Sequence, residues 1–263
     1  MIELDATILY SLITALIVGF ASGYIGSLMV LKKMALVGDA LSHVALPGLA
    51  LGIVFKFEPY IGAFAFLFVS AILTWKLERS TKLSFEAIVG TLFTLSLAIG
   101  ILLIPEIDLL EALFGDITQV TFIDTVIAIL VSILTVLVTR SIYRKVVLSM
   151  MSEELASSSG IDVSKVNLIY ILMVSLVVAI GIKIVGTLLV GAMVIVPAAT
   201  AKNVATNLTR YAWTSALFGL LSTFIGVVFS FFTIFPAGPL VVITGTVIFV
   251  TTVLLRGRLI KTP

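Results

Sequence analysis

The 263-residue sequence contains no cysteine, so it can form neither a disulfide nor a metal site with thiolate ligands. Charged residues make up only 11 per cent of it, whereas a soluble domain carries about a quarter. The sequence has no Gly-Lys dipeptide and therefore no P-loop for the phosphates of ATP. Its first residues, MIELDATILY, lack the basic region of a cleaved signal peptide, so we expect this segment to remain in the protein.

Apolar residues dominate what is present, at 60 per cent of the chain, and the mean hydropathy is +1.28. Several apolar runs reach the roughly 20 residues that a helix needs to cross a bilayer. Together they predict an all-α, polytopic integral membrane protein. The candidate segments are Thr7–Leu31, Leu36–Phe55, Tyr60–Trp75, Phe85–Ile104, Phe122–Thr139, Val166–Ile182, Ile184–Ala199, Tyr211–Phe232 and Leu240–Leu255.

The segment Ile184–Ala199 is barely long enough to span, so the prediction is eight or nine transmembrane helices. Residues 1–263 contain no linker, low-complexity tract or soluble segment, which predicts a single transmembrane domain. Two pairs of glycines, Gly19 with Gly23 and Gly48 with Gly52, have the spacing that lets membrane helices approach closely. Glu86, near the start of its segment, fits the preference of helix N-termini for negative charge.

The charges of the loops predict which ends of the segments face the cytoplasm. Basic residues at alternate loops mark the cytoplasmic side: Lys32, Lys33, Arg79, Arg140, Arg144, Lys145, Lys202 and Arg210. The connection after Ile104 has only acidic charges, which are Glu106, Asp108, Glu111, Asp116 and Asp124. It is therefore placed outside, as is the acidic N-terminus. Within that connection, 109–114 is a candidate surface helix. Lys183 falls near an outer end against this pattern, so it must snorkel or face a wet cavity.

One apolar stretch, LVGDALSHVALPGLALG at 36–52, contains Asp39 and the only histidine, His43. Four residues make about one helical turn, so the two side chains stand on one face. Pro47 cannot donate a hydrogen bond to the carbonyl of His43. This face therefore offers three possible cation ligands: a carboxylate, an imidazole and a carbonyl oxygen.

A purely structural role remains open, with Asp39 as an N-cap and His43 as a core histidine. Inside a membrane, however, each buried ionisable group costs roughly 2.5–3.5 kcal/mol, and two of them on one face favour a functional site.

The longest polar stretch, SMMSEELASSSGIDVSK at 149–165, lies on the predicted cytoplasmic side. Glu153, Glu154, Leu155 and Ala156 predict a short helix, which the serines before Gly160 terminate. This helix is a candidate docking element for a partner subunit. An ordinary solvated loop is the alternative.

Five motifs occur in an order typical of one family: GDALSHVALPG at 38–48, EALFGD at 111–116, SEELASSSGID at 152–162, GTLLVGAMVIVPAATAKNVA at 186–205 and PAGPLVVI at 236–243. Over nearly its whole length the chain resembles the membrane permease of ATP-binding-cassette importers for zinc, manganese or iron. The resemblance implies a multi-pass permease in a prokaryotic cell membrane that is not itself an enzyme. Its implied partners are a second copy, a cytoplasmic ATPase dimer and an extracytoplasmic metal-binding protein. Membrane lipid surrounds it, nucleic acid is not a partner, and the cation is cargo, not a permanent cofactor.

The resemblance also implies roles for particular residues. Asp39 and His43 match the family's GDxxSH motif, which the family uses for metal passage, and Glu153, Glu154, Ala156 and Gly160 match its ATPase-coupling segment. Two copies could bring two carboxylates and two imidazoles toward one pathway. That set suits tetrahedral zinc, whereas manganese prefers more oxygen ligands. We therefore expect zinc, with manganese or iron as alternatives.

Two other functions were considered for the acid and the histidine. An ion-coupled secondary transporter could use Asp39 and His43 as a proton or cation relay. An intramembrane enzyme is disfavoured because adjacent helical residues such as Ser42 and His43 point about 100° apart and cannot form a nucleophile–base pair.

Overall fold

The structure, a computed structural model, describes residues 6–81, 83–104 and 112–259. Within these ranges the regular elements are all helices, and no β-strand occurs, as the composition predicts. The elements are α1 Ala6–Leu31, α2 Ala35–Val44, α3 Leu46–Phe55, α4 Pro59–Ser80, α5 Phe85–Leu103, η1 Ile117–Gln119, α7 Phe122–Met151, α8 Glu153–Ser158, α9 Val163–Val185, α10 Val190–Val204, α11 Leu208–Ser230 and α12 Ala237–Leu259.

Eight stretches of the described chain are long and apolar enough to cross a membrane, with α2 and α3 together forming one of them. The shorter α10 has 15 residues and rises about 22 Å, less than the roughly 30 Å of a bilayer core. The prediction of eight or nine spans is therefore confirmed, and α10 is the segment that made the count uncertain. Several helices run past their predicted ends; among them, α4 continues to Ser80 and α7 to Met151.

Polar side chains fix where several helices begin. The Thr121 hydroxyl and the Asp124 carboxylate form a capping box that starts α7. Ser84, Asp162 and Asn207 cap α5, α9 and α11 in the same way, each accepting from a backbone N–H three residues later. Glu86 lies in the first turn of α5, where the sequence placed it.

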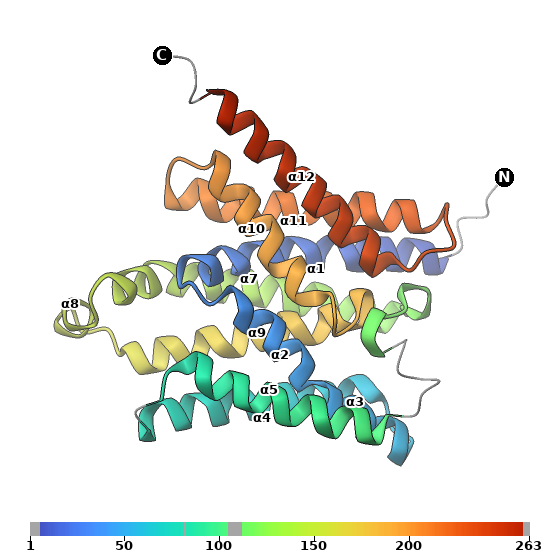
Figure 1. The fold of residues 1–263 in the computed structure, drawn as a ribbon, viewed down its shortest axis with the longest axis horizontal. Helices are drawn as coiled ribbons and strands as arrows, with labels where there is room; N and C mark the ends of the chain where they lie inside the picture. Colours follow the sequence, from blue (N-terminus) through green and yellow to red (C-terminus); the bar gives the residue numbers. More distant parts are fainter. Residues whose placement is uncertain (1–5, 82, 105–111, 260–263) are drawn as a thin grey trace.

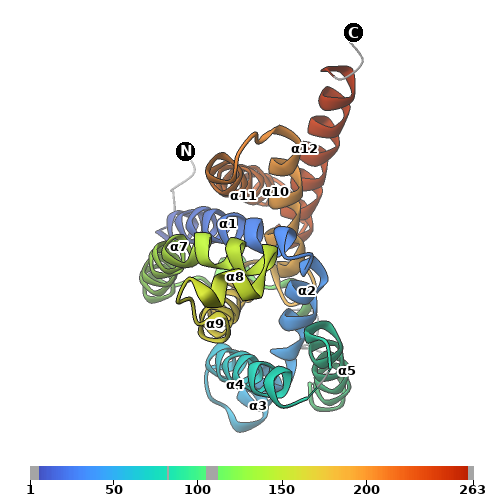
Figure 2. The ribbon, with the colours of Figure 1, turned by 90° about the vertical axis from the view of Figure 1, so that its left-hand side faces the viewer.

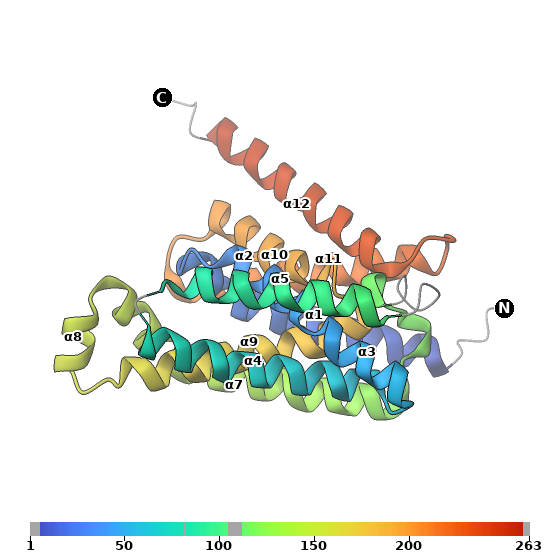
Figure 3. The ribbon, with the colours of Figure 1, turned by 60° about the horizontal axis from the view of Figure 1, so that its bottom comes forward.

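The bundle is built around α1, which packs against α7, α9, α10 and α11 (Figure 1). On one side of this centre lies a group made of α3, α4 and α5, in which α4 packs against α9, and α2 runs between that group and α10 (Figure 2). The last helix, α12, crosses the others at an angle, and its C-terminal half extends away from the bundle (Figure 3).

Small residues allow the closest helix contacts, as their spacing predicted. A Cβ on Gly19 or Gly23 of α1 would collide with Thr223 or Ser215 of α11. A Cβ on Gly48 of α3 would collide with the backbone of Gly62 in α4. The absence of a side chain at Gly48 therefore lets α3 and α4 pack closely as a hairpin.

The turns alternate between the two ends of the bundle. Those that follow α1, α4 and α10 lie at the same end as α8, whereas α1 begins at the opposite end (Figure 1). The end with α8 has most of the basic residues of the described chain, with Lys56 and Lys183 at the other end, so the positive-inside rule makes it the cytoplasmic end. Of the predicted acidic outer connection, Glu106, Asp108 and Glu111 lie outside the described residues. So do residues 109–111 of the predicted helix at 109–114, whereas 112–114 are helical.

Candidate functional site

Asp39 and His43 both lie in α2, one turn apart. The helix begins at Ala35 with Met34 as its N-cap, so Asp39 stands in the second turn and is not an N-cap. The structural alternative for Asp39 is therefore wrong. Helix α2 ends directly after His43, and α3 restarts at Leu46 with Pro47 in its first turn. Because Pro47 has no amide hydrogen to donate to the carbonyl of His43, an interruption of the helix is expected at this position.

The His43 imidazole is buried, with 7% of the residue exposed, and packs against the Phe93 ring of α5 at a centroid distance of 5.3 Å. Its Nδ1 atom has no hydrogen-bond partner within residues 6–81, 83–104 and 112–259. The negative charge of Asp39 acts on this ring. Buried polar atoms are rarely left without a partner. With the proton on Nε2, Nδ1 presents a lone pair that could bind a cation.

Asp39 is half-buried against the first turn of α10. A Cβ on Gly191 would lie 2.7 Å from the Asp39 Cα and 2.8 Å from both its Cβ and its Oδ1, so only glycine leaves room for this carboxylate. The N-terminal end of a helix also favours a nearby negative charge. The Ser42 hydroxyl lies 2.6 Å from the carbonyl oxygens of both Asp39 and Thr187, which ties α2 to the segment before α10.

Two other motifs, at 111–116 and 236–243, gather around that segment, which is itself part of the motif at 186–205. The backbone N–H groups of Thr187 and Leu188 donate to the carbonyls of Ala112 and Leu113 at 3.1 and 3.0 Å. Gly186, at φ +77°, needs the left-handed conformation and leaves no room for a side chain beside Leu113. A Cβ on Gly238 would lie 2.7 Å from the carbonyl oxygen of Val185. Motifs far apart in the sequence thus meet at the segment before α10, which Ser42 ties to α2, while 152–162 lies at the opposite end.

The site is open on one side. Leu36 is 81% exposed, and Asp39 and Ala40, one turn further along the same face, are partly exposed. No group of three or more His, Asp or Glu side chains that could hold a metal ion occurs among the described residues. A single chain therefore provides two side-chain donors, fewer than the four of a tetrahedral site.

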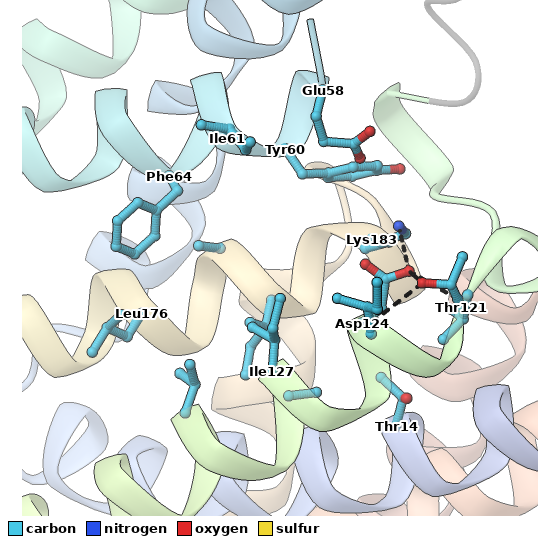
Figure 4. Close-up of a pocket in the computed structure, with 16 residues that line it drawn as sticks. Thr14, Glu58, Tyr60, Ile61, Phe64, Thr121, Asp124, Ile127, Leu176 and Lys183 are labelled. Carbon is cyan, nitrogen blue, oxygen red and sulfur yellow. Dashed lines mark hydrogen bonds and ion pairs between the residues drawn. The ribbon is translucent and has the colours of Figure 1, made fainter.

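Lys183 is paired, which the sequence did not predict. Its ammonium lies 2.8 Å from the Asp124 carboxylate and 4.9 Å from the centroid of the Tyr60 ring (Figure 4). The Lys183 and Asp124 side chains are only 16% and 25% exposed. Lys183 also lines a cavity, one of the two alternatives that the sequence suggested, and its charge is paired there with Asp124 at the outer ends of α7 and α9.

The predicted helix in the long polar loop is present as α8, capped by Ser152. Glu153 and Glu154 are exposed, and Gly160 ends the segment at φ +76°. Ala156 is fully buried, so it packs within the chain and does not form part of a docking surface. Two apolar residues that were not among the predicted coupling residues, Met151 and Leu155, are 80% and 60% exposed here.

Lys32, in the turn between α1 and α2, connects this end of the chain to the helix that contains Asp39 and His43. Its ammonium donates to the Asn167 side chain of α9 at 2.9 Å and lies 5.1 Å from the centroid of the Tyr170 ring. Burial lowers the pKa of Lys32, against the opposing effect of the Glu78 and Glu153 carboxylates. The turn that starts α2 is thus held near α8 and α9.

These features define a multi-pass α-helical membrane protein with an acid and a histidine on one spanning segment. The sequence profile of the ABC 3 transport family matches residues 5–256, and the chain belongs to that family. It is 32% identical over 243 residues to the manganese transport system membrane protein MntC of Listeria innocua, covering 91% of this chain and 87% of the relative. It is also 32% identical over 255 residues to the high-affinity zinc uptake system membrane protein ZnuB of Haemophilus influenzae, covering 95% and 97%.

A solved structure, PsaBC from Streptococcus pneumoniae in complex with Fab, has a similar fold. It matches with a TM-score of 0.80 and 30% identity, over 92% of this chain and 89% of that one. The resemblance to importer permeases that the motifs indicated is confirmed at the level of the family.

Proposed function

We propose that the chain is the permease subunit of an ATP-binding-cassette importer for a divalent metal, with residues 1–263 acting as one transmembrane domain. Membership of the ABC 3 transport family and the similarity to manganese and zinc transport proteins support this assignment. Because the sequence lacks a P-loop, ATP hydrolysis belongs to a separate cytoplasmic ATPase dimer. An extracytoplasmic protein delivers the cation at the end opposite α8. Family membership also favours ATP-driven import over ion-coupled secondary transport.

The cation passes between Asp39 and His43. The observation that supports this step is the buried, unpartnered Nδ1 of His43 one turn from a carboxylate on a membrane-spanning helix. Two copies related by a two-fold axis would supply two imidazoles and two carboxylates. A set that needs two chains can also come apart, which a transport site requires in order to release its ion.

Zinc is the proposed cargo. The manganese and zinc relatives named above are equally identical to this chain, at 32%, so similarity does not choose between the metals. Two imidazole nitrogens with two carboxylate oxygens suit tetrahedral zinc, whereas manganese favours a higher coordination number and more oxygen.

Metal uptake by the complex reconstituted with its ATPase tests the site. Asp39→Ala and His43→Ala should each abolish zinc uptake while the ATPase still co-purifies. Glu86→Ala, which removes an exposed acid on α5, is the matched control and should transport normally. Full uptake by either site variant would rule out the assignment. Manganese should compete with zinc at least about tenfold more weakly, and equal competition would contradict the choice of zinc.

Docking of the ATPase is assigned to the exposed face of α8. Leu155→Asp replaces a 60% exposed apolar side chain with a charge and should reduce the ATPase recovered with the permease. Ile234→Asp makes the same kind of change at a residue that is 97% exposed at the opposite end, and it should have no effect on recovery. Unchanged recovery with Leu155→Asp would contradict the docking role.

A further inference from the structure

A cavity of about 610 Å³ lies between α4, α7 and α9, at the end of the bundle opposite α8 (Figure 4). It is separate from Asp39 and His43, which do not line it. Its walls are mostly apolar, and several wall residues are well exposed: Ile61 63%, Phe64 40%, Ile123 68% and Ile127 47%. These residues belong to helices long and apolar enough to span, so the cavity opens at the side of the bundle, where the hydrocarbon of a bilayer would lie.

The cavity is polar at one end only. Lys183, Asp124 and Thr121 point toward one another there, with Tyr60 and Glu58 facing them across the opening (Figure 4). Asp124 accepts from the Thr121 hydroxyl at 2.6 Å and from the Lys183 ammonium at 2.8 Å. Glu58 is exposed and takes part in no ion pair with another described residue. Two carboxylates and one ammonium leave this end with a net charge of one negative.

The apolar walls continue from the polar end toward the middle of the membrane. Leu176 precedes Lys183 by seven residues on α9, which is about 10 Å of helix. The cavity therefore has the layout of a membrane lipid, polar at the outer surface and apolar below it. A hydrocarbon chain fits the walls, and a head group fits the end with Glu58 and Lys183.

We propose that this cavity binds an outer-leaflet phospholipid whose head group contains a primary amine, such as phosphatidylethanolamine. The amine lies beside the Glu58 carboxylate, the phosphate accepts a hydrogen bond from a remaining N–H of Lys183, and an acyl chain covers Phe64 and Ile127. Phosphatidylglycerol lacks the amine and brings a net negative charge to an end that is already negative. Selection of the head group therefore depends on Glu58, while the walls accept any acyl chain.

Fluorescence quenching in lipid nanodiscs tests the proposal. Phe64→Trp places a fluorescent reporter on the cavity wall of the full-length chain. Its fluorescence is obtained by comparison with the parent, which contains only Trp75 and Trp213. Brominated phosphatidylethanolamine should quench the reporter at a mole fraction about fivefold lower than brominated phosphatidylglycerol. This ratio is the difference in binding expected from one partly exposed charge pair. Glu58→Gln should bring that ratio close to one, and Glu58→Asp should preserve it.

Leu137→Trp is the matched control, because Leu137 is 60% exposed on α7 and does not line the cavity. Both lipids should quench it equally, with or without Glu58→Gln. Equal quenching of the Phe64→Trp reporter by the two lipids would overturn the head-group selection. If neither lipid quenched it, the cavity would be covered by protein and the proposal would be wrong.

Discussion

The contact between Asp39 and Gly191 gives the sharpest test of how the site is held together. In Gly191→Ala the new methyl group would start 2.7–2.8 Å from three Asp39 atoms, whereas carbon atoms normally approach to about 3.5–4.0 Å. The first turn of α10 and α2 must therefore separate by about 1 Å. Overpacking of this size costs about 1–3 kcal/mol. A displacement of about 1 Å at a functional group can cost roughly a hundredfold in rate, so we expect zinc uptake to fall at least about tenfold.

Gly90→Ala is the control for the glycine-to-alanine change itself. A Cβ on Gly90 of α5 meets no atom within 4 Å, so only helix propensity changes there, by about 1 kcal/mol in favour of alanine. Gly90→Ala should transport normally and unfold at the same or a higher temperature. Thermal unfolding in detergent and zinc uptake are measured for both variants. Normal uptake by Gly191→Ala would refute the view that Gly191 positions Asp39.

Two further predictions concern the outer end of the bundle. Lys183→Met leaves the Asp124 carboxylate without its ammonium partner; because only a quarter of the Asp124 side chain is exposed, we expect a loss of stability of about 1–3 kcal/mol, measured as a fall in Tm. The control is Lys165→Met, in an ion pair whose lysine side chain is 78% exposed, and it should cost less than about 1 kcal/mol. Equal falls in Tm for the two variants would contradict the role of burial. Burial raises the pKa of Asp116, but hydrogen bonds from Thr118 and Gln119 outweigh it and leave the pKa below the usual 3.8. The charged Asp116 carboxylate therefore stabilises the fold at neutral pH, and this contribution is lost as the pH falls below 3.8. Asp116→Asn should lower Tm at pH 7, and the Tm difference from the parent should shrink near pH 3. A Tm difference that stays constant with pH would refute a stabilising role for the charged carboxylate.

The spanning helices and the Asp39–His43 pair could be predicted from the sequence because both depend on local patterns. Lipid requires long apolar runs, and the helical period alone puts residues four apart on one face. The contacts that complete the site are not local. Nothing near Lys183 identifies Asp124, 59 residues away, as its partner. Gly191 matters only because α10 begins beside Asp39, and Ala156 is buried only because α8 folds back onto α7 and α9.

The exposure of Asp39 bears on how the proposed importer is assembled. A carboxylate that faced lipid in the middle of a membrane would be costly, so its open side must be covered by protein or by water. The neighbouring residues Leu36, which is exposed, and Ala40, which is partly exposed, lie on the same face and offer no polar cover within the chain. A second copy applied to this face would exclude lipid and add another carboxylate and imidazole. The two chains could then hold a cation together and release it as they separate, which neither chain could do alone with two donors.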